Sequence, residues 1–189
     1  MVSKELGLCD GFWLVRRYRR RSPPLMQVGG TSCWSTLRIP EDKELWTAQH
    51  DVEAYFYRLG IPPEIGRFFA LKEVPPWVAF KFAVPRDEAP GGGAWFPYFR
   101  VVPMGWSWAM WIAQRVHVQA HVLAGFPPAA IIVDGQPPPD LTQYDAVAMP
   151  YCDNGNILSL RREEADKAVN KVMEVLRGWR LGLQDITGP

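Results

Sequence analysis

The sequence predicts an α/β (α+β) domain of two layers, in which helices cover one face of an antiparallel sheet. Segments with strand and helix patterns follow in the order strand, hairpin, helix, hairpin, helix, which is typical of such a domain. Residues 163–178 place their apolar side chains on one helical face. Apolar residues at 146–152 and 157–158 flank the turn-forming triplet Asp153-Asn154-Gly155, which predicts a hairpin.

Length and composition agree with a packed core. The chain has 189 residues, 48% of them hydrophobic, and nine tryptophans, which is enough for one domain with a sizeable core. Its three cysteines, Cys9, Cys33 and Cys152, lack metal-ligand spacing and are typical of free thiols in a reducing compartment. We find neither a signal-peptide pattern nor an 18-residue apolar run, so we expect an intracellular protein without a membrane partner.

Residues 1–30 are predicted to form a basic arm, separate from a domain at 31–189. The arm combines an arginine cluster with Pro-Pro and Gly-Gly pairs and shows no periodicity. Such a cluster is often only solvated surface, but it also suits phosphate contact or a nuclear-import signal. A basic protein–protein adaptor is a further function class that this composition allows. The arginines are Arg16, Arg17, Arg19, Arg20 and Arg21.

Strand patterns follow the arm. Residues 45–51 alternate roughly and end at Asp51, and an aromatic cluster follows at 52–57. We predict short strands at 68–71 and 77–84. A loop with three glycines then leads to a return strand at 95–102.

Two helices are expected. The first covers residues 108–123, with Ser107 as its N-cap and a stop at Gly125. His117 and His121 are four residues apart on it. Because residue 118 is valine, the zinc-binding His-Glu-x-x-His pattern is absent, and we interpret both as helix-face histidines. The second helix is the amphipathic segment 163–178.

Two aspartates are the strongest candidates for chemistry. Asp51 ends a strand and Asp153 lies in the predicted hairpin turn. Carboxylates that converge from different elements can bind Mg²⁺, and two such ions can assist phosphoryl transfer. The alternative is a plain turn, because Asp-Asn-Gly is common turn chemistry.

Two segments containing these aspartates resemble motifs of one family. Asp51-Val52-Glu53-Ala54-Tyr55-Phe56 resembles motif A of reverse transcriptases, with an aspartate and an aromatic residue five positions later. Tyr151-Cys152-Asp153-Asn154 is similar to motif C, the Tyr-x-Asp-Asp box.

The other motifs occur in the family's order. Val102-Pro103-Met104-Gly105-Trp106, with Gln114 ten residues after Met104, resembles motif B. Residues 77–106 resemble the fingers hairpin, and the helix at 163–178 with Trp179 is similar to motif D. The resemblance covers about residues 45–183, and the ordered set is more specific than any single motif.

The resemblance implies an RNA-directed DNA polymerase, with a palm of antiparallel sheet and helices and partial fingers. Asp51 and Asp153 would hold two Mg²⁺ ions, or Mn²⁺ in their place, for nucleotidyl transfer. The implied partners are an RNA or DNA template with its primer and deoxynucleoside triphosphates. Phe56 would exclude a 2′-hydroxyl and Tyr151 would pack near the primer end. The residues implied around the nucleotide are Met104, Gly105, Trp106 and Gln114.

Departures from the family pattern support an alternative. Asn154 replaces the second aspartate of motif C, and Met104 replaces a glutamine that contacts the nucleotide. We also expect the thumb to be absent, because the sequence ends at Pro189. The alternative is a catalytically degenerate remnant that binds nucleic acid or has no chemical function.

Overall fold

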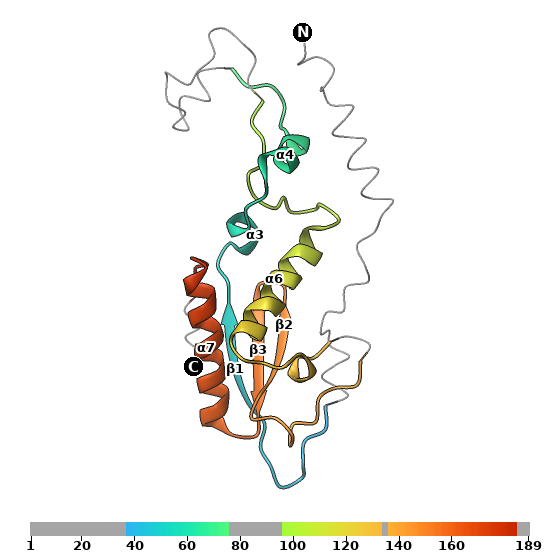
Figure 1. Cartoon of the computed structure of the whole chain (residues 1–189), viewed down its shortest axis with the longest axis vertical. Coiled ribbons are helices and arrows are strands. Elements are labelled where there is room, and N and C mark those ends of the chain that lie inside the picture. Colours follow the sequence, from blue (N-terminus) through green and yellow to red (C-terminus); the bar gives the residue numbers. More distant parts are fainter. Residues whose placement is uncertain (1–36, 76–95, 134–135, 185–189) are drawn as a thin grey trace.

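The centre of the fold is a three-stranded antiparallel sheet with two long helices packed on it (Figure 1). The computed structural model describes residues 37–75, 96–133 and 136–184. The strands are β1 (Trp46–Asp51), β2 (Val147–Tyr151) and β3 (Asn154–Ser159), in the order β1-β3-β2. The helices α6 (Ala109–Leu123) and α7 (Arg162–Gly178) contact the sheet and each other. The predicted α+β class is confirmed.

Strand β1 is far from β2 and β3 in the sequence. It pairs with β3 from Trp46 opposite Ser159 to Asp51 opposite Asn154. The side chains of Ala48 and His50 are buried, whereas Gln49 between them is exposed. This alternation is the period of two expected for a strand with one covered face.

Both predicted long helices are present, and they pack on the sheet through different kinds of residues. In α7 the buried residues recur at helical spacing and form a single apolar face. The buried positions of α6 include several alanines, which allow its backbone to approach β2. The predicted cap at Ser107 is wrong, because the N-cap is Trp108 and makes no side-chain capping bond. The buried residues of α7 are Ala165, Val169, Val172 and Leu176.

The aromatic segments between β1 and α6 are helical turns and isolated bridges. After β1 come α3 (Tyr55–Arg58), α4 (Pro63–Gly66) and the 3₁₀ helix η1 (Arg67–Phe69), and η3 (Pro128–Ala130) follows α6. The predicted strand at 68–71 is therefore wrong.

The predicted return strand is wrong within 96–102. Those residues make only isolated bridges, Tyr98 with Ala70 and Val101 with Gly60. Pro97 and Pro103 lack the N–H groups that a continuous ladder needs. Residues 77–95, predicted as the rest of that hairpin, and the arm at 1–30 lie outside the described residues.

The hairpin turn lies one position earlier than its sequence indicates. Tyr151 pairs with Asn154, so the two-residue loop is Cys152-Asp153, with Cys152 at φ 53°. Gly155 is a strand residue opposite His50. It is required for packing, because a Cβ there would lie 2.9 Å from Nδ1 of His50 and closer still to two other ring atoms.

Candidate functional site

The two predicted metal-binding aspartates lie at the same end of the sheet. Asp51 is the last residue of β1 and pairs in register with Asn154, the neighbour of Asp153. The N–H of Val52 donates to the carbonyl oxygen of Asp153 at 3.0 Å. Burial, and then the nearby Asp153 carboxylate, raise the pKa of Asp51. The fold therefore brings two carboxylates within electrostatic reach, although about a hundred residues separate them in the sequence.

Asn154 reaches back to the hairpin-tip carboxylate. Its Nδ2 donates to Oδ1 of Asp153 at 3.0 Å on the exposed side of the hairpin. A side-chain amide can ligate a hard cation through its oxygen but adds no negative charge. Asn154 therefore lies beside the acid pair and occupies one oxygen of Asp153.

Gln114 of α6 hydrogen-bonds through its side chain to the backbone of the β2–β3 hairpin. Its Nε2 donates to the carbonyl oxygen of Pro150 at 2.8 Å, and its Oε1 accepts from the N–H of Cys152 at 2.7 Å. Gln114 is 4% exposed, so both ends of its amide are used inside the protein. A nucleotide contact by Gln114, as the resemblance implies, would require these bonds to break.

The other predicted site residues differ in exposure and conformation. Tyr151 is exposed next to the turn, and Met104 is exposed ahead of α6. Gly105 has φ 89°, a conformation that favours glycine, and Trp106 packs against Phe69 with ring centroids 5.2 Å apart.

Phe56 lies in α3 and is partly buried against the core. Its proposed contact with an incoming sugar stays a prediction. The five arginines from Arg16 to Arg21 lie outside the described residues.

Sequence reasoning did not find a cluster of three histidines directly beneath the acid pair. His50 of β1 meets His117 and His121 of α6, and all three side chains are buried. The chain contains only three histidines, and all of them are here. Two signals could have found the cluster: the inward position of His50 in the alternation of β1, and the spacing of His117 and His121 on the face of α6 that bears alanines.

Burial dominates the electrostatics of this cluster. Burial, and then His121, lower the pKa of His50 to about 3. Burial, and then His121 and His50, lower the pKa of His117 well below its usual value. Burial also lowers the pKa of His121 to about 4. Burial, followed by the charge of Asp153, raises the pKa of the Cys152 thiol to about 11. All four groups are therefore neutral near pH 7.

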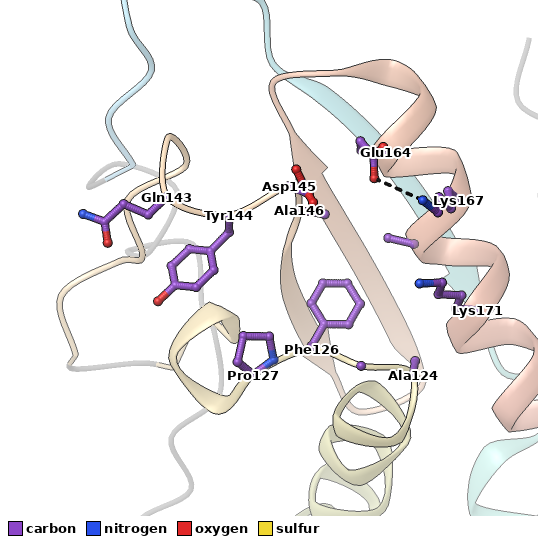
Figure 2. A pocket seen from close by; sticks show the side chains of 12 residues that line it. Ala124, Phe126, Pro127, Gln143, Tyr144, Asp145, Ala146, Glu164, Lys167 and Lys171 are labelled. Carbon is purple, nitrogen blue, oxygen red and sulfur yellow. Dashed lines mark ion pairs between the residues drawn. The ribbon is translucent and has the colours of Figure 1, made fainter.

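A hollow of about 330 Å³ lies at the opposite end of the sheet (Figure 2). Residues just before β2, the end of α6 and the first turns of α7 line it, and Glu164 and Lys167 form an ion pair across 4.0 Å at its wall. None of the residues predicted to bind metal or nucleotide lines this hollow. The acid pair and the hollow are therefore separate features.

Comparison with known proteins adds no identification. No family model matches the chain, and no curated protein matches it. Within the described residues, the helices are too short or too polar to cross a membrane.

Proposed function

We propose that this chain is a reverse transcriptase-like palm in which Asp51 and Asp153 bind divalent cations for template-directed nucleotidyl transfer. The observation that carries the proposal is the convergence of these two carboxylates at one end of the sheet, in the order and motif context of the sequence. Two hard cations held between such carboxylates can stabilise the attacking and leaving oxygens of a phosphoryl transfer.

The surroundings of the acid pair support this assignment. The hairpin carrying Asp153 is fixed to α6 by both ends of the Gln114 amide, so the carboxylate projects from a rigid support. Burial, and then repulsion from the Asp153 carboxylate, raise the pKa of Asp51, and a cation between the carboxylates would relieve that repulsion. Exposed Tyr151 next to the turn could pack against a primer end.

One contact favours the alternative, a remnant that has lost catalysis. Asn154 donates to Asp153 where the family pattern has another carboxylate. Two aspartates neutralise less of the charge of two divalent ions than three carboxylates would. We therefore expect weak cation binding and slow transfer even if the polymerase assignment is correct.

The experiment is a Mn²⁺ titration followed by electron paramagnetic resonance, with primer extension in parallel. Asp153→Asn should abolish Mn²⁺ binding at this site, and Asn154→Asp should tighten it, because hard cations favour carboxylates. Asp166→Asn is the matched control, because Asp166 is an exposed aspartate on α7 that pairs with Arg162. It should change neither readout.

The outcomes separate the two hypotheses. Extension that depends on Asp153 and increases with Asn154→Asp supports a polymerase. Cation binding without extension, in both the native chain and Asn154→Asp, supports the remnant. If neither Asp153→Asn nor Asn154→Asp alters Mn²⁺ binding, the hairpin tip is an ordinary turn and the proposal fails.

A further inference from the structure

The histidine cluster has the composition and geometry of a transition-metal site. His50 projects from β1, and His117 and His121 project from successive turns of α6. One ring nitrogen from each lies within 4.8 Å of the other two. The exposed fractions are 2%, 0% and 0%, so these rings are shielded from bulk solvent.

Hydrogen bonds to backbone carbonyls fix two of the three tautomers. Nδ1 of His117 lies 2.7 Å from the carbonyl oxygen of Cys152, and Nδ1 of His121 lies 2.9 Å from that of His117. A carbonyl oxygen can only accept, so each Nδ1 carries the proton and each Nε2 presents a lone pair. This is the arrangement that orients metal-binding histidines in proteins.

The free lone pair of His121 is the sharpest sign of a missing ligand. Its Nε2 is fully buried and has no hydrogen-bond partner among the described residues. A buried polar atom without a partner loses the free energy of a hydrogen bond to water. A cation bound to Nε2 would remove that penalty.

His50 completes the set through a change of tautomer. Its Nε2 is 2.8 Å from Nε2 of His117. Because Nε2 of His117 carries only a lone pair, Nε2 of His50 must be the donor when no metal is bound. Its Nδ1 is then also buried and unpartnered. Moving the proton of His50 from Nε2 to Nδ1 frees a third lone pair and releases no net proton.

The chemistry of the ligands selects the metal. Three neutral imidazoles suit zinc and its neighbours, whereas Mg²⁺ prefers oxygen. At a Zn–N distance of about 2.0–2.1 Å, tetrahedral ligand nitrogens are about 3.3 Å apart. This separation lies between the 2.8 Å contact and the 4.8 Å limit of the cluster, so small ring rotations suffice.

The thiol of Cys152 faces elsewhere, with Sγ 3.6 Å from Sδ of Met110. The protein therefore supplies three imidazoles and leaves the fourth position to a small ligand such as water. The acid pair adjoins these histidines along the chain: Asp51 follows His50 directly, and Asp153 follows Cys152, whose carbonyl oxygen accepts the hydrogen bond from His117. Their charge would offset part of the cation's charge.

We propose that His50, His117 and His121 bind one zinc-class cation that fastens β1 to α6. The site joins two elements of the fold, and it is distinct from the binding of hard cations by Asp51 and Asp153. It does not depend on the polymerase assignment.

The test is titration of the full chain, produced without a histidine tag and stripped with a chelator, with Co²⁺ alone. We expect one Co²⁺ per chain, visible absorption bands of a four- or five-coordinate ion, and displacement by Zn²⁺ but not by excess Mg²⁺. Proton resonance of the Co²⁺ form should show three shifted, exchangeable Nδ1–H signals. Zn²⁺ should raise the thermal midpoint of the stripped protein, since a ligand of the native state stabilises it.

Variants and controls make the result decisive. His121→Gln should weaken Co²⁺ binding by at least roughly 100-fold, since loss of second-shell partners already costs 10–100-fold. The control Cys9→Ser/Cys33→Ser should bind Co²⁺ as the native chain does, with no thiolate charge-transfer band in either.

If His121→Gln fails to fold, the three Nδ1–H signals of the native chain still decide the question. Absence of Co²⁺ binding to the native chain, binding without those three signals, or binding that survives in folded His121→Gln would each overturn the proposal. The cluster would then be a metal-free hydrogen-bonded network.

Discussion

Substitution of Gly155 by alanine tests the packing of β3 on the histidine cluster. The added Cβ would lie 2.9 Å from Nδ1 of His50 and closer to Cε1 and Nε2, whereas ordinary contacts begin near 3.4 Å. Either β3 shifts or His50 turns away. Overpacking of a core typically costs about 1–3 kcal/mol, and loss of the bond between His50 and His117 adds about 1 kcal/mol. We expect Gly155→Ala to lower the free energy of unfolding by roughly 2–4 kcal/mol.

Urea unfolding of the chelator-treated protein at pH 7.5 measures this change. Gly178→Ala is the matched control, because a Cβ at Gly178, the last residue of α7, meets no atom within 4 Å. It should be neutral or stabilising by up to about 1 kcal/mol, since alanine favours a helix over glycine. In a His50→Ala background, the cost of Gly155→Ala should largely disappear. An equal cost with and without the His50 ring would refute the steric argument.

The remaining predictions concern the histidines, Gln114 and Phe56. The histidine pKa values are lowered on folding, so the unfolded chain binds more protons below pH 6.5, and stability should fall as pH falls from about 6.5 towards 4. Chelator-treated protein unfolded by urea across this range should show a slope of up to roughly 1.4 kcal/mol per pH unit for each histidine, and a flat profile would contradict their burial as neutral groups. Gln114→Ala leaves Pro150 and Cys152 with unpaired backbone groups and should cost roughly 2–4 kcal/mol in urea unfolding, whereas the exposed Gln119→Ala on the same helix should be near neutral. If the chain extends primers, Phe56→Ala should increase ribonucleotide incorporation, and equal ribonucleotide use by both forms would remove the gate assignment.

Periodicity predicted the elements whose structure depends mainly on local pattern. The apolar face and stop signals of 109–123 and 162–178, and the alternation of 46–51, identify their elements within one or two residues. The closeness of the acid pair was also predicted from the sequence, because Asp51 ends a strand pattern and Asp153 lies in a predicted hairpin turn. Their closeness in space agrees with that hypothesis, while their chemistry stays a prediction.

The errors arise where distant parts of the chain decide the structure. Asp153-Asn154-Gly155 is typical of a turn, yet Gly155 is a strand residue that pairs with His50 of β1, and the ring of His50 leaves no room for a Cβ there. The pairing of His50 with the two histidines of α6 could not be predicted either, because His50 is 67 residues from His117. No local pattern reports a contact of that range. At 68–71, the aromatic run favoured a strand, but it forms a 3₁₀ turn instead.

The pairing of β1 with β3 has a consequence for how this protein folds. Strands β2 and β3 are joined by two residues, so their hairpin can form within microseconds as a local event. Strand β1 must close a loop of about a hundred residues before Asp51 reaches Asn154, and contacts of such range slow folding. The acid pair and the histidine cluster both require β1. We therefore expect both to arise in the same late step, so that a folding intermediate with an intact hairpin would still lack either site.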